Sequence, residues 1–167
     1  RWVPTGAPNA FVPLEAVITA VEGAAPRRWI EQVEIVHVPG ASAWLALDSA
    51  AAADPQGVLS IGGPLPAPAG MPELAEAAVE AREVAATVGE AERILLLGAD
   101  ATLARFVAAV TGRPRAWRWV HVAAHGVPDH QRPRSAGVPL ASGERLAGDR
   151  LLSLRVPAAT VVLSACE

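Results

Sequence analysis

The chain has 167 residues, of which 51% are hydrophobic and 19% are charged, and its formal net charge is −3. This composition excludes disordered and fibrous proteins, and the charge excludes the overall electrostatic character of a nucleic-acid binder. Every apolar run is interrupted before the roughly 20 residues that a membrane span needs. The single cysteine, Cys166, cannot form an internal disulfide and suits a reducing compartment. We therefore expect a soluble, cytoplasmic protein that contacts neither membranes nor nucleic acid.

The length of the chain suits one domain. We expect a single domain over residues 1–167 that is incomplete at both ends, because the chain starts without methionine and stops one residue after Cys166. The segment before that cysteine has the pattern of a buried strand, and domains rarely end on such a strand.

The first 70 residues contain two predicted strands. Residues 1–13 hold three prolines and are typical of an extended lead-in, whereas residues 14–21 fit a strand and a helix equally. Residues 32–38 are rich in β-branched side chains and stop at a Pro-Gly pair, which predicts a strand. Residues 58–61 predict a second strand, and a loop rich in proline and glycine follows over residues 62–70.

Helical periodicity begins after this loop. Pro72 occupies the expected first turn of a helix that ends at Gly89. Apolar residues recur at steps of three and four, which predicts one buried stripe made of Leu74, Ala78, Ala81, Ala85 and Val88. The acidic residues of the same segment are expected on the solvent-exposed face; they are Glu73, Glu76, Glu80 and Glu83.

The second half of the chain continues the alternation of strands and helices. Residues 93–97 and 117–124 predict strands, with a helix between them that opens at residues 98–100 and closes at Gly112. A small hairpin around residues 138–146, a short helix at 149–154 and a strand at 160–165 complete the pattern. Short, almost continuously apolar strands are typical of parallel sheets covered on both faces. We therefore expect an α/β fold, a three-layer α/β/α sandwich with a mostly parallel sheet.

Two reactive side chains follow predicted strands. His125 comes directly after one strand, and Cys166 comes directly after the last. Functional groups of open parallel sheets gather beyond the carboxyl ends of the strands, and neighbouring strands lie about 4.8 Å apart. If the two strands are neighbours, the imidazole can act as a base toward the thiol and lower its pKa. The backbone amides of Gly126 and Cys166 would then bind an oxyanion.

A plainer interpretation stays open, because a lone cysteine at a strand end is more often a buried small hydrophobe. The remaining histidines are weaker candidates. His121 and His125 lie about 13 Å apart if both are on a strand, so we expect no shared metal ion. His37 fits a core or edge position, and His130 fits a solvated loop.

The other polar residues predict no further site. Neither Ser135 nor Ser164 lies in the elbow sequence of a serine hydrolase, and the chain has no P-loop or GxGxxG motif. No cofactor is therefore expected. Five arginines are expected to form a solvated rim that flanks the Cys-His pair; they are Arg113, Arg115, Arg118, Arg132 and Arg134.

Several segments carry a family resemblance. Residues 120–126 are VHVAAHG, and residues 161–167 are VVLSACE. Four further pieces precede or separate them in the same order, namely Val38-Pro39, Glu80-Ala81, LLGADAT at 96–102 and SAGVPLASGERL at 135–146. With these pieces, residues 31–167 resemble the CHAT domain, a caspase-like cysteine peptidase domain of clan CD that is often joined to tetratricopeptide repeats.

The resemblance implies a function and its residues. It implies a bacterial-type cysteine endopeptidase with His125 as base, Cys166 as nucleophile and Gly126 on the oxyanion side, acting on a protein or peptide substrate without a cofactor. Regulatory repeat domains, fused or associated, are implied partners. The alternative is a catalytically silent domain that serves as an interaction scaffold.

The resemblance also bears on the chain end. Family members continue past the cysteine with elements that shape the substrate pocket, so the residues that bind substrate cannot be named from this sequence. We expect the loop after Glu167 to form part of that cleft and to be disordered or cleaved.

Overall fold

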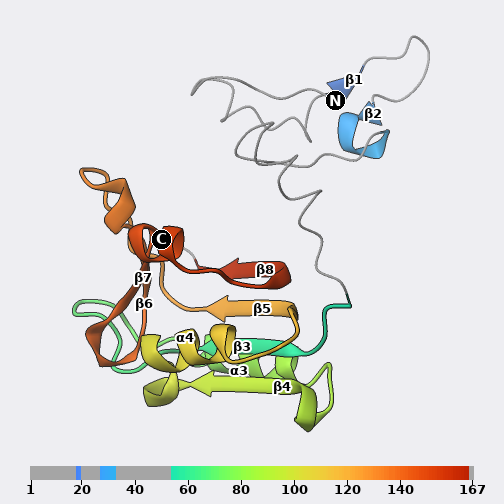
Figure 1. Ribbon diagram of the computed structural model, residues 1–167. Helices are drawn as coiled ribbons and strands as arrows, with labels where there is room; N and C mark the ends of the chain where they lie inside the picture. Colours follow the sequence, from blue (N-terminus) through green and yellow to red (C-terminus); the bar gives the residue numbers. More distant parts are fainter. Residues whose placement is uncertain (1–17, 20–26, 33–53, 166–167) are drawn as a thin grey trace. The chain divides into compact units, whose positions relative to one another are not determined.

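The computed structural model describes residues 18–19, 27–32 and 54–165. The chain divides into two units, Arg1–Ala51 and Ala52–Glu167. In the first unit, β1 (Ile18–Thr19) pairs antiparallel with β2 (Arg27–Arg28), and the 3-10 turn η2 (Trp29–Glu31) follows (Figure 1).

Two predictions fall in this first unit. The segment 14–21, which fitted a strand and a helix equally, contains a strand at its described residues 18–19. Of the predicted strand at 32–38, only Gln32 is described, and it lies in a turn. The rest of that segment, including His37, lies outside the described residues.

The second unit is built on a four-stranded parallel sheet with the order β4-β3-β5-β8 (Figure 1). Each strand was predicted from its apolar run, within two residues at either end. The expectation that the last strand is buried is wrong, because six of the seven residues of β8 are exposed. Since all four strands run in the same direction, their carboxyl ends meet at one edge of the sheet. The strands are β3 (Val58–Gly62), β4 (Arg93–Leu97), β5 (Trp117–Ala123) and β8 (Ala158–Ser164).

The two central strands present different side chains to the two faces of the sheet, because successive residues of a strand alternate. On one face the side chains are apolar and at most 1% exposed, and they belong to the main core; they are Leu59, Ile61, Val120 and Val122. The opposite face carries the buried polar residues Ser60 and His121. One face of these two strands therefore contributes only apolar side chains to the core, whereas the other face also carries buried polar side chains.

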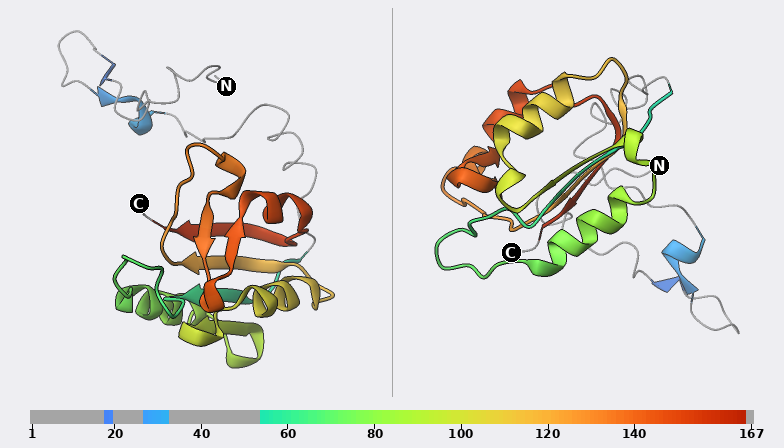
Figure 2. Two further views of the ribbon diagram at one scale, coloured as in Figure 1. Left: turned by 90° about the vertical axis from the view of Figure 1, so that its left-hand side faces the viewer. Right: turned by 90° about the horizontal axis from the view of Figure 1, so that it is seen from below.

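Helices cover both faces, which confirms the three-layer α/β/α architecture (Figure 2). α3 (Ala75–Ala85) lies on the face that carries the buried polar residues. α4 (Leu103–Thr111) and α5 (Gly148–Ser153) lie on the other side. Among the described residues, no helix is both long and apolar enough to cross a membrane.

The α3 helix differs from its prediction. It starts at Ala75 rather than at Pro72, because Leu74 before it has non-helical backbone angles. Its buried residues are Ala77, Ala81 and Ala85, so the stripe is shifted by one position at its start. This stripe of small side chains packs against Gly62, where an added Cβ would collide with the Ala77 carbonyl oxygen and the Ala81 Cβ. The helix therefore approaches the sheet closely.

The second helix also starts later than predicted. Residues Gly98–Asp100 form a separate 3-10 turn, η4, and α4 begins at Leu103. The Thr102 hydroxyl oxygen caps it by accepting a hydrogen bond from the Arg105 N–H. Gly112 ends the helix, as predicted.

The predicted hairpin is formed by β6 (Gly137–Pro139) and β7 (Arg145–Ala147), which pair antiparallel. Val127 and Gly137 hydrogen-bond to each other in both directions, at 2.9 and 3.1 Å. The hairpin is therefore attached to the chain just after β5, at the carboxyl edge of the sheet.

Candidate functional site

Backbone hydrogen bonds continue past the ends of three strands at this edge. The Gly63 N–H donates to the Ala123 carbonyl oxygen at 3.1 Å, and the Ala124 N–H donates to the Ser164 carbonyl oxygen at 3.2 Å. Ala123 is also paired with Ser164 in the register of β5 and β8. The strands that precede the two candidate catalytic residues are therefore direct neighbours, as the Cys-His interpretation requires.

His125 follows these bonded residues, and its ring has one close partner. Its Nε2 lies 2.8 Å from the carbonyl oxygen of Pro72, in the segment that leads into α3. A carbonyl oxygen only accepts hydrogen bonds, so Nε2 carries the proton and Nδ1 holds the lone pair of the neutral ring. The approach to α3 thus fixes both the tautomer and the direction of the imidazole.

Gly126 and Cys166 complete the predicted set. Within the described part of the chain, the Gly126 N–H donates to no oxygen, so this amide is available to a ligand. Cys166 lies outside the described residues, whose last member is Ala165. The structure therefore places His125 and Gly126 together at the carboxyl edge, one and two residues beyond the bond between Ala124 and Ser164.

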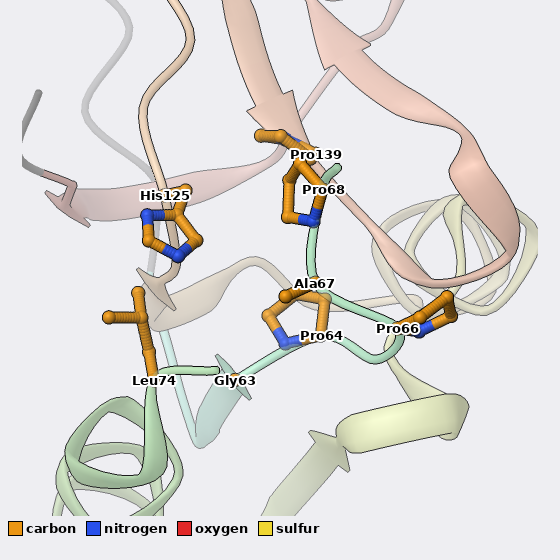
Figure 3. A pocket seen from close by; sticks show the side chains of 8 residues that line it. All are labelled: Gly63, Pro64, Pro66, Ala67, Pro68, Leu74, His125 and Pro139. Carbon is orange, nitrogen blue, oxygen red and sulfur yellow. The ribbon is translucent and has the colours of Figure 1, made fainter. Parts of the chain in front are cut away.

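A pocket opens beside the His125 ring (Figure 3). Apart from His125, none of its lining side chains carries a charge or a hydrogen-bonding group. Prolines are numerous in the lining, and their fixed φ angles stiffen the loop after β3. The surface next to the imidazole is therefore apolar and rigid. The remaining lining residues are Gly63, Pro64, Pro66, Ala67, Pro68, Leu74 and Pro139.

A second polar cluster lies between α3 and the sheet. His121 is 3% exposed, with its Nε2 2.9 Å from Glu80 Oε1 and its Nδ1 3.0 Å from Ser60 Oγ. The Ser164 hydroxyl donates to the other oxygen of Glu80, Oε2, at 3.2 Å. Both ring nitrogens of His121 are thus occupied by protein groups.

The charge state of this cluster follows from the Glu80 carboxyl. Its pKa is held below its ordinary value, chiefly by the hydrogen bond from His121, while partial burial acts in the opposite direction and the bond from Ser164 lowers it further. Glu80 is therefore a carboxylate at neutral pH and accepts from its neighbours. His121 then donates its Nε2–H to Glu80, and its Nδ1 shares a hydrogen bond with the Ser60 hydroxyl.

Two predictions about surface charges are wrong in part. Glu80 was expected on the solvent-exposed face of its helix, yet it contacts His121 and Ser164 because the buried stripe is shifted toward Ala77. Three of the five arginines lie at the amino end of β5, the opposite edge of the sheet from His125; they are Arg113, Arg115 and Arg118. They are held there by local partners, such as the Trp117 ring 3.9 Å from the Arg113 guanidinium carbon.

Other predictions about exposed residues are confirmed. His130 is exposed in the loop after β5, Glu73 is exposed just before α3, and Glu76 and Glu83 are exposed on α3. The contact between His125 and the Pro72 carbonyl was missed by sequence reasoning, because a backbone acceptor leaves no residue-type signal. The polar cluster around Glu80 was missed, although Glu80, His121 and Ser164 were each noted separately.

A comparison with protein families gives one match. The family model described as CHAT domain matches residues 1–167, the whole chain. The chain matches no curated protein and no solved structure. The family match extends beyond residues 31–167, over which the sequence segments carry the resemblance.

Proposed function

We propose that this chain, which belongs to the CHAT domain family of caspase-like, cysteine peptidase-related domains, is a cysteine endopeptidase. In this proposal Cys166 is the nucleophile, His125 is the base, and the substrate is a peptide bond of a protein. No cofactor takes part.

The parallel pairing of β5 and β8 is the observation that carries the proposal. Ala123 is paired with Ser164 in this register. His125 follows Ala123 by two residues, and Cys166 follows Ser164 by two residues. Ser164 faces α3 through its bond to Glu80, and the His125 ring is bonded to the segment leading into α3. The two candidate catalytic residues thus follow neighbouring, paired strands at the same distance along the sequence, which supports their assignment as a dyad.

The tautomer of His125 supports its role as the base. With Nε2 donating to the Pro72 carbonyl, the lone pair of Nδ1 is free to take the proton of the Cys166 thiol. The thiolate attacks the carbonyl carbon of the substrate, and the Gly126 and Cys166 amides bind the oxyanion that forms. The imidazolium then protonates the leaving amine as the C–N bond breaks.

Hydrolysis of the acyl-enzyme completes the cycle. His125 takes a proton from water, the hydroxide attacks the thioester carbon, and the thiolate leaves as the carboxylic acid product forms. The imidazolium then returns its proton to the Cys166 thiolate, which replaces the proton that left with the amine, and no oxidant or reductant is needed.

A substrate side chain would lie against the apolar surface beside His125, where the hollow itself is too small to enclose it. Its lining is apolar apart from the imidazole, and several rigid proline rings limit its adjustment. We therefore expect it to accept an uncharged side chain and to reject carboxylates and ammonium groups, which would lose their hydration there.

The test is a peptide-library cleavage assay on the full chain, with Cys166→Ala and His125→Ala as matched variants. We expect cleavage by the wild type, with uncharged residues enriched at one position beside the cleaved bond, and none by Cys166→Ala. Equal cleavage by wild type and Cys166→Ala overturns the peptidase proposal. Absence of cleavage by all three proteins favours the scaffold alternative.

A further inference from the structure

A network of three hydrogen bonds connects four elements of the second unit. Ser60 of β3 contacts His121 of β5, His121 contacts Glu80 of α3, and Glu80 accepts from Ser164 of β8. The separations are 3.0, 2.9 and 3.2 Å in that order. The bonded residues are 41 to 84 positions apart in the sequence, so this hydrogen-bond network belongs to the tertiary structure and not to local turns.

Ser164 is the residue through which this hydrogen-bond network reaches the candidate site. It is the last residue of β8, two positions before Cys166. Its hydroxyl donates to Glu80 Oε2, while its carbonyl oxygen accepts from the Ala124 N–H, directly before His125. The end of β8 is therefore held at two atoms, once toward the helix and once toward the strand of the base.

We propose that Glu80 and Ser164 are positioning residues for the Cys166–His125 dyad. The Glu80 carboxylate, itself oriented by His121, anchors the end of β8 so that the residue two positions later meets the His125 imidazole. This inference rests on the peptidase function proposed above. It assigns neither Glu80 nor Ser164 any contact with substrate.

The composition of the cluster argues for a role beyond packing. His121 is 3% exposed, and a buried histidine is costly unless its ring nitrogens are hydrogen-bonded, whereas the Glu80 side chain that meets it keeps 44% of its surface exposed. A hydroxyl that donates to this carboxylate adds a directional restraint, which an apolar contact does not supply. That restraint acts on the residue of β8 from which the chain continues to the nucleophile.

The charged groups around this bond are few. In the described part of the chain, the titratable members of the cluster are Glu80 from α3 and His121 from β5, whereas β3 and β8 contribute only the hydroxyls of Ser60 and Ser164. His125 lies further along, bonded to the Pro72 carbonyl. A change at the Ser164 hydroxyl therefore alters the position of the strand end without removing a charge from the dyad.

The experiment measures iodoacetamide alkylation of the full-length protein from pH 5 to 10. Cys166 is the one cysteine of the 167 residues, and mass spectrometry of the peptide that contains it restricts the measured rate to this thiol. Ser164→Ala removes the hydroxyl, Ser164→Thr keeps it, and Thr160→Val removes a hydroxyl from the same face of β8 as the matched control. Thermal unfolding of each variant shows whether the fold is kept.

We expect Ser164→Ala to raise the apparent thiol pKa by about one unit, which lowers alkylation at pH 6 about tenfold. At pH 10 the rate should stay within about twofold of wild type, because the thiol is equally accessible. Ser164→Thr and Thr160→Val should keep the wild-type profile. A purely structural role for Ser164 would lower the melting temperature of Ser164→Ala and leave its pH profile unchanged, and that result overturns the inference.

The same data separate this inference from the peptidase proposal. His125→Ala should abolish the reactivity of Cys166 at pH 6 if the dyad exists. A wild-type profile that already matches free cysteine overturns the dyad, and the positioning role falls with it. A depressed wild-type pKa that is lost in His125→Ala but kept in both Ser164→Ala and Glu80→Gln leaves the dyad standing and overturns the positioning role alone.

Discussion

Replacing Gly62 by alanine should separate α3 from the sheet. Gly62 ends β3, and a Cβ built on it would lie inside the contact distance of both the Ala77 carbonyl oxygen and the Ala81 Cβ. Non-bonded carbon atoms need about 3.5 Å or more. Since one of the two colliding atoms belongs to the helix backbone, a side-chain rotation cannot relieve the contact, and the helix itself has to move.

The size of the effect follows from two contributions. Overpacking a closely packed contact costs about 1–3 kcal/mol. Moving the helix also stretches the bond between His121 and Glu80, and a hydrogen bond to a charged group contributes about 1.5–3 kcal/mol. Alanine returns about 0.4–1 kcal/mol by restricting the unfolded chain. We therefore expect the unfolding free energy of Gly62→Ala to fall by about 2–5 kcal/mol.

Urea denaturation followed by tryptophan fluorescence measures this change, and Gly89→Ala is the control. Gly89 has a φ of −63° and no atom within 4 Å of an added Cβ, so its replacement should be neutral or slightly stabilising. The displaced helix should also weaken the contact of Pro72 with His125 and thereby raise the apparent pKa of the Cys166 thiol. A Gly62→Ala protein within 0.5 kcal/mol of wild type, a margin typical of neutral substitutions, would refute the close approach of α3.

Two further predictions concern stability. Trp117 is 1% exposed and donates its Nε1–H to the Ala109 carbonyl oxygen at 3.2 Å, so Trp117→Ala should lower the unfolding free energy by about 3–5 kcal/mol in the same urea assay. The pKa of Glu80 is lower in the folded than in the unfolded chain, so its contribution is complete above the unfolded value near 4.3 and is lost as the pH falls through the folded value. Glu80→Gln should therefore flatten the loss of stability below about pH 4.5, whereas the exposed Glu83→Gln should leave the acid limb unchanged.

Strand positions could be predicted from the sequence because each strand of the parallel sheet is a short apolar run closed by glycine, proline or a polar residue. The run from Val58 is buried on both faces, and so is most of β5, which is why the two stand out from their surroundings. The placement of His125 after a strand followed from the same signal. That the strands before His125 and Cys166 are neighbours did not follow, since strand order depends on crossovers that local patterns do not specify.

The rotation of α3 about its own axis could not be predicted from its composition. Its segment is so rich in alanine that several stripes satisfy the helical period, and alanine burial does not distinguish among them. The tertiary partner decides: Gly62 admits Ala77 and Ala81, and this rotation carries Glu80 toward the sheet. To predict the contact between Glu80 and His121, both the rotation of the helix and the order of the strands would have to be known.

The position of β8 gives the Glu80 bond its importance. Within the described part of the chain, β8 is one of the two edge strands of the sheet and has β5 as its one ladder partner. Its residues Val161 and Leu163 are 52% and 56% exposed, so packing holds this strand less firmly than it holds the central ones. A nucleophile that follows such a strand would inherit its motion, and misplacement by about 1 Å costs an enzyme about a hundredfold in rate. The bond from Ser164 to Glu80 supplies a second restraint at the end nearest the nucleophile, from a helix that is itself pressed against β3 at Gly62.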